Sequence, residues 1–279
     1  MDLSLLKQKL DGLQQKQSPN SQKTDYTTIF WRPSIGKQQV RIVPSVLDSK
    51  NPFKELKFYY GITNKVMISP LNFGEKDPIY LFAQKLREEY NKENYILAKK
   101  LDAKTRIFVP VVVRGEEDKG VRLWQFGKQV YEELLALAVD DEIGDYTDIV
   151  NGRDLTVETV GPESTGTPYN KSSVRVRLKT SPLSEDKTQV ETWLKEQPNP
   201  TEVFKRYSFD EMKIALEKWL SPEDANEGDI IDEPNDDFED TKQSTSNFNL
   251  DTSKAKQSKV DEFDNLFGES NKEPDNLPF

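Results

Sequence analysis

Residues 104–128, KTRIFVPVVVRGEEDKGVRLWQFGK, constrain the fold more than any other stretch of the chain. A run rich in Val, Ile and Phe at 106–114 is followed by a Gly-bounded acidic turn and a second run at 121–126, which predicts a β-hairpin. Because side chains alternate along a strand, Arg122, Trp124 and Phe126 should share one face. That face is either an exposed platform for stacking or part of the hydrophobic core, and the hairpin alone leaves both interpretations open.

The chain contains neither Cys nor His. This composition excludes disulfides, zinc sites built on thiolate or imidazole, Cys nucleophiles, and Ser–His and Cys–His dyads. We therefore expect no metal and no cofactor. The longest apolar run, residues 107–113, is far shorter than the roughly 20 residues of a spanning helix, and the N-terminus lacks the apolar region of a signal peptide. No membrane association is expected.

The net charge of −10 is divided unevenly along the chain. Residues 221–279 carry 17 acidic residues and 5 lysines, a net charge of −12, whereas residues 1–220 carry 34 basic and 32 acidic residues, a net charge of +2. A mildly basic body with a strongly acidic tail indicates a nucleic-acid or interaction role, in which the tail competes for a basic groove. A tail that only increases solubility is the other interpretation.

The composition divides the chain into three regions. Residues 1–25 begin with leucines at helical spacing and continue as a polar linker, so they are expected to form a flexible N-terminal arm that docks on a neighbouring copy or packs back on its own domain. Residues 26–220 form the core, and residues 221–279 are too polar to bury a core and are expected to be disordered. Among the acids of this tail stand candidate partner-binding residues, as in a short linear motif: Phe263, Leu266, Phe267, Leu277 and Phe279.

The core alternates strands with a few helices, which predicts an α+β fold with a mainly β core. Ser208, with Glu211 three residues later, is a capping box and marks the start of a closing helix. In the last predicted strand Arg175 and Arg177 share one face. Strands are predicted at 26–32, 37–44, 53–62, 106–114, 121–126, 155–160 and 173–180, and helices at 79–89, 128–139, 187–197 and 209–220.

Cations recur beside aromatic residues in the core. Residues 53–62 place Tyr59 among lysines, residues 95–106 form the densest basic run, and Arg41 lies on the face opposite Val40. This combination is the pattern by which proteins neutralise phosphates and stack bases. Each cluster taken alone also fits a solvated sheet face.

Three motifs carry a resemblance to a known family. They are VRIVPS at 40–45; the basic run, valine-rich strand, acidic turn and aromatic-x-Phe-Gly-Lys ending across 99–128; and FKRYSFDEM at 204–212. The chain resembles the helix-destabilising single-stranded DNA-binding proteins of T4-type bacteriophages. The resemblance covers residues 37–220 in detail and the two flanks in kind.

The resemblance implies an OB-like barrel with an attached helical subdomain, which coats single-stranded DNA during phage replication, recombination and repair in the cytoplasm of an infected bacterium. It also implies self-association along the strand through the arm, although no close match to the family's short basic motif is found there, and recruitment of replication and recombination proteins by the tail. Trp124 is then expected to face the DNA, with Phe126 left between cleft and core. The candidate strand contacts are Arg41, Tyr59, Tyr90, Tyr95, Lys99, Lys100, Arg106, Phe108, Arg122, Trp124, Lys128, Arg175 and Arg177.

One departure from the family concerns zinc. Members such as the T4 protein hold zinc through His and Cys with a CPVC-like segment, where this chain reads DPIY at 77–80. Apolar packing by Phe73, Ile79, Tyr80 and Phe82 is expected to hold this loop instead.

Two rival functions fit the sequence less well. A metal-dependent nuclease would need converging carboxylates, but Glu116, Glu117 and Asp118 are consecutive in a turn, where side chains splay apart. The chain is therefore expected not to be an enzyme. An acidic-tailed interaction scaffold or chaperone without nucleic-acid binding is the remaining alternative; it explains the tail but not the cations beside aromatics.

Overall fold

The computed structural model describes residues 26–221 together with Lys259, Phe263, Leu266 and Phe267. The predicted arm at 1–25, most of the acidic tail, and Leu277 and Phe279 lie outside the described residues. The elements are, in chain order, α2 (Tyr26–Ile29), β1 (Phe30–Trp31), β2 (Gly36–Ile42), β3 (Lys54–Tyr59), β4 (Met67–Ile68), η1 (Pro70–Phe73), α3 (Pro78–Glu88), α4 (Lys92–Lys100), β5 (Lys104–Val113), η2 (Glu117–Lys119), β6 (Arg122–Phe126), α5 (Lys128–Ala138), β7 (Arg153–Val160), α6 (Pro162–Thr165), β8 (Lys171–Thr180), α7 (Lys187–Lys195), α8 (Pro200–Val203) and α9 (Phe209–Leu220).

All described strands belong to one mixed sheet. Its main path runs β1-β6-β5-β2-β7-β8, while β3 pairs with β5 and carries β4 at its other edge. The β1–β6 pair is parallel, and the other pairs are antiparallel. The ten-residue strand β5 therefore pairs with three neighbours, β2, β3 and β6, and is the centre of the fold.

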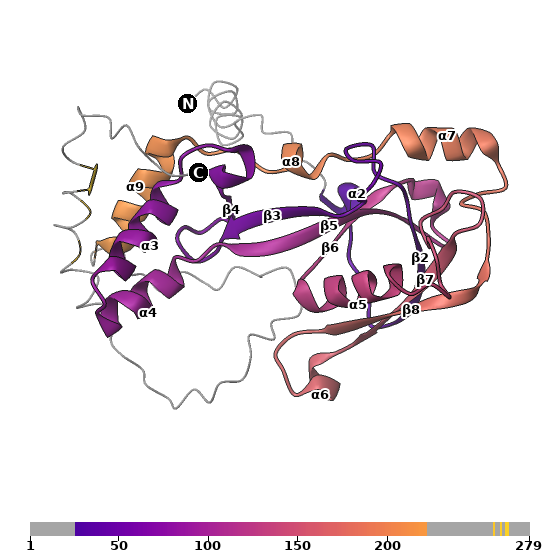
Figure 1. The fold of residues 1–279 in the computed structure, drawn as a ribbon, viewed down its shortest axis with the longest axis horizontal. Coiled ribbons are helices and arrows are strands. Elements are labelled where there is room, and N and C mark those ends of the chain that lie inside the picture. The colour runs from indigo at the N-terminus through magenta and orange to yellow at the C-terminus, as the bar shows by residue number, and fades with distance from the viewer. Residues whose placement is uncertain (1–25, 222–258, 260–262, 264–265, 268–279) are drawn as a thin grey trace, which may run out of the picture.

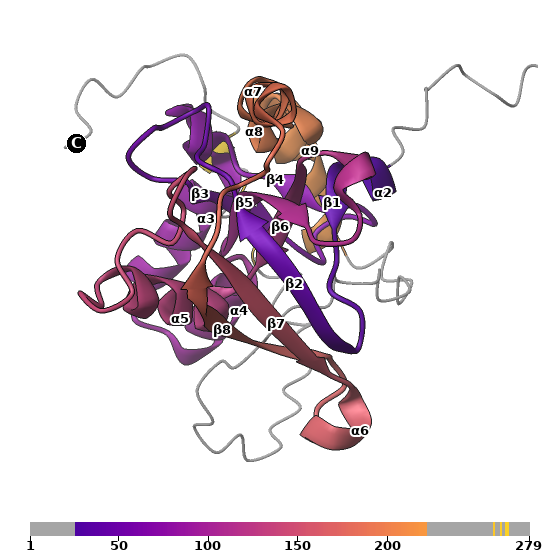
Figure 2. The same cartoon turned by 90° about the vertical axis from the view of Figure 1, so that its right-hand side faces the viewer.

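The sheet is strongly twisted (Figures 1 and 2), and one large hydrophobic cluster lies against it. This core joins Trp31 of the edge strand β1 with Val174 of the opposite edge strand β8, and Val130 and Leu134 of α5 cover it. Both edge strands therefore contribute residues to one continuous cluster, on the face of the sheet that α5 covers. The predicted α+β class with a mainly β core is confirmed.

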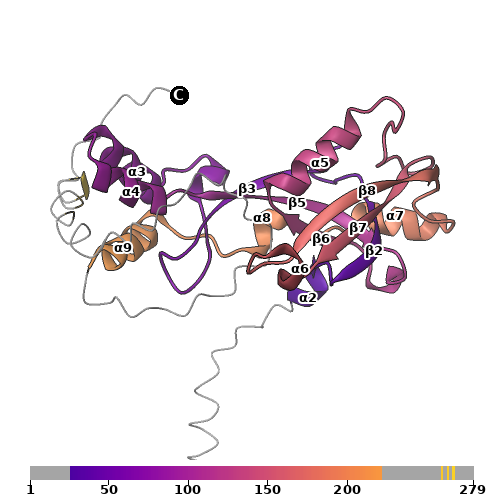
Figure 3. The same cartoon turned by 90° about the horizontal axis from the view of Figure 1, so that it is seen from below.

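A second core lies at the other end of the molecule, where α3, α4 and α9 pack together (Figures 1 and 3). Helix α3 starts where Asp77 caps it and Pro78 occupies its first turn. Helix α9 starts with the predicted capping box, in which the Glu211 N–H donates to Ser208 Oγ and the Ser208 N–H donates to Glu211 Oε2. Strands β3 and β5 connect this helical subdomain to the rest of the sheet.

Most predicted elements are present, and the short elements β4, η1, α6 and α8 were not predicted. Residues 26–32 form the short helix α2 before the two-residue strand β1 instead of one strand. Residues 92–100 form helix α4, capped by Asn91, where the sequence suggested only a basic run. No described helix has the length and apolar content needed to cross a bilayer.

Candidate nucleic-acid interface

Trp124 and Phe126 are core residues. Both are fully buried, and the Trp124 ring lies 5.4 Å from the Trp31 ring and 4.7 Å from the Phe126 ring, between centroids. The predicted exposure of Trp124 is therefore wrong, and the choice left open for Phe126 is decided in favour of the core. The cause is tertiary packing: these rings belong to the core cluster that Val130 and Leu134 of α5 cover.

Arg122 lies on the same face of β6, as predicted, but at its buried end. Its guanidinium Nη2 lies 2.5 Å from Glu116 Oε2, and Lys119 Nζ lies 3.1 Å from the same oxygen. Hydrogen bonds from Arg122 and then Lys119 hold the pKa of Glu116 below its ordinary value. Glu117 accepts a hydrogen bond from the Gly115 N–H. These contacts close the hairpin turn, so Arg122 is not an exposed cation and two of the three turn carboxylates are engaged within the turn.

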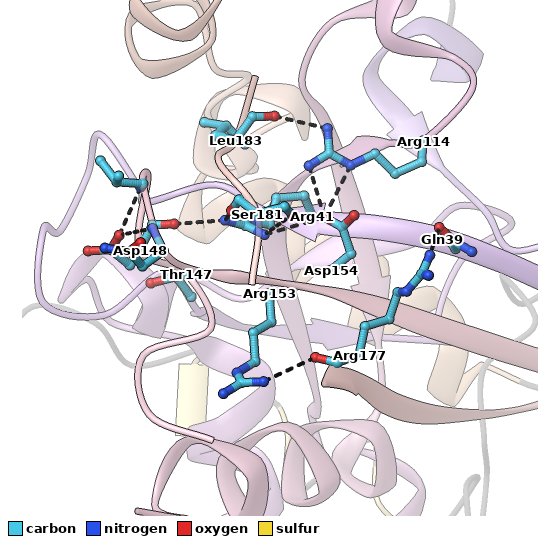
Figure 4. Close-up of polar contacts among 12 residues, drawn as sticks. Gln39, Arg41, Arg114, Thr147, Asp148, Arg153, Asp154, Arg177, Ser181 and Leu183 are labelled. Carbon is cyan, nitrogen blue, oxygen red and sulfur yellow. Dashed lines mark hydrogen bonds and ion pairs between the residues drawn. The ribbon is translucent and has the colours of Figure 1, made fainter. Parts of the chain in front are cut away.

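Arg41 is fully buried and ties together three segments (Figure 4). Its Nη2 donates to the carbonyl oxygens of Asp148 and Ser181, both at 2.8 Å, and its Nη1 lies 3.4 Å from Asp154 Oδ1. Arg114 also binds Asp154, at 2.8 Å. Desolvation lowers the pKa of Arg41, opposed by the charge of Asp154. The expected DNA contact is therefore a buried cross-link, because β2 runs through the middle of the sheet with both faces covered there.

Three further candidates are buried in strands β3 and β5. Tyr59 donates a 2.9 Å hydrogen bond to Asp77, and burial, followed by the charge of Asp77, raises the pKa of its phenol. Phe108 packs against Phe58, with 5.9 Å between ring centroids. Arg106 is buried beside Tyr60, 5.5 Å from its ring centroid. The prediction that Tyr59, Phe108 and Arg106 are exposed is therefore wrong, because the strand faces that carry these side chains are covered.

The exposed candidates gather on and before helix α4. Lys92, Tyr95 and Lys99 occupy positions i, i+3 and i+7, which form one stripe on a helix, and all three are exposed. Lys100 is exposed beside Lys99. Tyr90, immediately before the helix cap, is 98% exposed and Tyr95 is 60% exposed. The structure thus brings together four predicted residues, Tyr90, Tyr95, Lys99 and Lys100, and adds Lys92; we call these five residues the α4 stripe.

A second cation–aromatic group lies where α4 leads into β5. Lys104 Nζ and Arg106 Cζ lie 5.7 Å and 5.5 Å from the Tyr60 ring centroid. Nearby in the fold, the Arg206 guanidinium stacks 3.6 Å from the centroid of Phe73, which joins Tyr60 in one hydrophobic cluster. We call Tyr60, Phe73, Lys104 and Arg206 the Tyr60 cluster. The sequence prediction chose Tyr59 over Tyr60, although strand alternation requires that only one of the two face the core.

The remaining candidates are exposed on strand β8 and helix α5. Arg175 and Arg177 lie on the outer face of β8, and Arg177 donates a 2.6 Å hydrogen bond to Gln39 Oε1 (Figure 4). Lys128 is exposed at the start of α5 and lies 3.3 Å from Glu132. They are carried by elements other than α4, so they do not belong to the α4 stripe.

A buried aspartate organises the loop in which the resembling family holds zinc. Asp77 accepts hydrogen bonds from Ser69 Oγ at 2.5 Å, from Tyr59 and from the backbone N–H groups of Ile79 and Tyr80. Of the apolar residues expected there, Ile79 and Phe82 are buried in the helical core, Phe73 packs in another cluster, and Tyr80 is 40% exposed. Polar and apolar contacts therefore share the role that was predicted for apolar packing alone.

Of the candidate partner-binding residues that the structure describes, two are buried and one is exposed. Phe263 and Phe267 are buried against the helical subdomain of their own chain, and Leu266 is partly exposed. These residues belong to the part of the tail that the sequence sets apart as a partner-binding tip. Here α3 and α9 offer an apolar surface that the two phenylalanine rings cover.

Comparison with known proteins identifies the family. No curated protein matches the chain. A family model described as gp32 DNA binding protein like matches residues 35–221. The matched range spans β2 to α9 and so contains the α4 stripe, the Tyr60 cluster, the helical subdomain and all of the sheet except β1. The chain therefore belongs to the gp32-like family of DNA-binding proteins.

Proposed function

We propose that this protein is a non-catalytic single-stranded DNA-binding protein that coats strands during phage DNA replication, recombination and repair, in the cytoplasm of an infected bacterium. Family membership supports DNA binding, and the α4 stripe supports a preference for single strands. In that stripe Tyr95 stands one turn from a lysine on either side, so a base can stack on the ring while flanking phosphates meet the cations.

The backbone at Tyr90 supports the same proposal. Tyr90 adopts φ 50°, in the left-handed region that glycine usually fills after a helix, and its ring is almost fully exposed. The conformation costs about 1–2 kcal/mol, and no burial of the ring offsets it. The conformation ends α3 and needs no side chain, so an exposed aromatic residue where glycine would fit without strain is consistent with a residue kept for binding.

The energetics follow from these groups. Stacking contributes about 1–3 kcal/mol per base and tolerates every base, because all bases have a π-face. Each lysine that neutralises a phosphate releases a counterion, so affinity falls steeply with salt. Low sequence preference suits a protein that coats strands of any sequence, and high salt sensitivity is the expected consequence of its phosphate contacts. Self-association through residues 1–25 and recruitment of replication and recombination proteins by the acidic tail complete the proposal.

The test is a titration of end-labelled dT oligonucleotides of several lengths, followed by anisotropy at two salt concentrations. Label anisotropy is preferable to tryptophan quenching because Trp31, Trp124 and Trp193 are all buried. We expect binding to dT that exceeds binding to duplex of equal length. Absence of dT binding at low salt would instead favour an interaction scaffold without nucleic-acid binding.

Matched variants make the test specific to the α4 stripe. Tyr95→Ala should weaken dT binding by about 1–3 kcal/mol, whereas Tyr80→Ala, which removes another exposed tyrosine, should not. Lys99→Gln with Lys100→Gln should reduce the slope of log affinity against log salt by about 0.7 for each phosphate that is no longer neutralised. Lys187→Gln with Lys195→Gln, on α7 at the far end of the molecule from α4 (Figure 1), is the control and should leave the slope unchanged.

A further inference from the structure

The last described residues of the chain pack against its own helical subdomain. Phe263 and Phe267 are 1% and 7% exposed and share a hydrophobic cluster with residues of α3 and α9. The Phe263 ring lies 5.9 Å from the Phe82 ring of α3, and the Phe267 ring lies 6.0 Å from the Phe209 ring of α9, between centroids. The two rings also touch one another, 4.9 Å apart. We call Lys259, Phe263, Leu266 and Phe267 the docked tail segment.

Polar contacts fix the direction of this segment. Lys213 Nζ on α9 donates a 2.9 Å hydrogen bond to the carbonyl oxygen of Phe267, and it lies 5.9 Å and 5.5 Å from the ring centroids of Phe263 and Phe267. At the other end Lys259 Nζ lies 3.1 Å from Glu89 Oε2. The Phe263 N–H donates to the Lys259 carbonyl at 3.0 Å, one helical turn away. Both ends are thus held by groups of the helical subdomain.

The docked tail segment has the composition of a ligand for another protein. The sequence from Lys259 to Phe267, KVDEFDNLF, places two phenylalanines four residues apart among acids, which is the pattern of a short amphipathic motif that binds in a groove. The rings that would fill a partner's groove are the ones that α3 and α9 already cover. A phenylalanine buried on this surface cannot bind a second protein at the same time.

We propose that the docked tail segment is an intramolecular ligand of the α3–α9 surface, and that its phenylalanines reach other proteins only after it is released. The surface then accepts acidic segments with two phenylalanines at this spacing, with Lys213 as the polar contact. Because the segment is attached to the chain that carries its site, its effective concentration is on the order of millimolar, which a free peptide must outcompete. This mechanism stands whether or not the protein binds DNA.

The experiment measures binding of a fluorescein-labelled peptide of residues 256–270, KQSKVDEFDNLFGES, to full-length proteins by anisotropy. The wild type should bind the peptide weakly because its site is occupied. The variant Phe263→Ala with Phe267→Ala should bind at least about tenfold more tightly, because the competing segment no longer docks. The matched control Phe238→Ala with Phe248→Ala removes two other phenylalanines of the acidic tail and should behave as the wild type.

Further variants assign the site on the surface. In the Phe263→Ala, Phe267→Ala background, Lys213→Glu should reduce peptide binding severalfold, whereas Lys218→Glu, an exposed lysine on the same helix, should not. Circular dichroism and thermal unfolding confirm that each variant is folded. Equal peptide binding by wild type and double variant, or no binding by a folded double variant, overturns the proposal. A third result would be that the wild type excludes the peptide only at protein concentrations where light scattering detects dimers. That result would show that the segment docks on a second copy, and it would also overturn the proposal.

Discussion

Tyr59 donates a 2.9 Å hydrogen bond to the buried carboxylate of Asp77 and so joins the end of β3 to the start of α3. Its neighbour Tyr60 faces the other way and meets Lys104 and Arg106. Two consecutive tyrosines thus serve different purposes. Tyr59 holds the helical subdomain against the sheet, and Tyr60 offers a ring beside cations at the surface.

This difference gives a pair of opposite expectations. Tyr59→Phe should lower the free energy of unfolding by about 1–3 kcal/mol, because Asp77 keeps its burial and loses a donor, while affinity for dT stays unchanged. Tyr60→Leu should keep stability nearly constant and weaken dT binding. Urea unfolding and dT anisotropy measure the two quantities. If Tyr60→Leu bound dT as the wild type does, the Tyr60 cluster would not contact the strand.

Tyr90→Gly should separate stability from binding by moving them in opposite directions. Glycine adopts the left-handed conformation without steric cost, so the variant should be more stable by about 1 kcal/mol. It also lacks the ring, so dT affinity should fall. Thermal unfolding and dT anisotropy on the same preparation are the measurements. A more stable variant with unaltered affinity would remove Tyr90 from the proposed interface.

Gly152 is required by the buried cross-link of Arg41. A Cβ at this position would lie 2.3 Å from the Asp148 carbonyl oxygen and 2.5 Å from Arg41 Nη2 (Figure 4 shows this network). Gly152→Ala should therefore lower the free energy of unfolding by about 2–3 kcal/mol through overpacking. Gly161→Ala is the matched control, because its nearest neighbour is the tip of the exposed Ile35 side chain, 3.0 Å away. Equal stability of the two variants in urea would contradict this role.

The Glu116–Arg122 pair should make the free energy of unfolding fall as the pH becomes acidic. The pKa of Glu116 is lowered in the folded protein, so its contribution is present above the unfolded pKa, about 4.3, and is lost as pH falls through the folded value. Glu116→Gln should cost about 1 kcal/mol at pH 7, a modest figure because Glu116 is 36% exposed, and should flatten the decline of stability below pH 5. Asp118→Asn in the same turn is the control. If the free energies of unfolding of wild type and Glu116→Gln changed in parallel with pH, the pair would contribute nothing to the pH dependence of stability.

Removal of residues 222–279 should strengthen binding to duplex DNA at low salt, because a segment with a net charge of −12 no longer competes with the strand. The difference should shrink at high salt through screening. Deletion also uncovers the α3–α9 surface, so the full-length Phe263→Ala, Phe267→Ala variant, which keeps the charge, is the necessary comparison. Equal duplex affinity of deletion and wild type would restrict the tail to protein contacts.

Local patterns in the sequence determined the elements and the class of the fold. The hairpin formed by β5 and β6 follows from β-branched residues on both sides of a Gly-bounded turn, and α9 begins at Ser208 because its capping box satisfies backbone groups locally. Charge division, the absence of Cys and His, and the motifs at 40–45, 99–128 and 204–212 also sufficed to identify the family. Turns, helix caps and short motifs are formed by residues that are close together in the chain, so the sequence alone reveals them.

Only the tertiary structure decided which side chains reach the surface. Alternation correctly placed Arg122, Trp124 and Phe126 on one face of β6. Whether the two rings are covered depends on residues of β1, α5 and β8, which come from distant parts of the chain. Arg41 is buried because Asp154 and the carbonyls of residues 148 and 181 converge on it from more than a hundred residues away. Phe263 and Phe267 are covered for the same reason, by helices that end far upstream. Burial results from long-range packing, and a sequence pattern specifies faces without specifying what covers them.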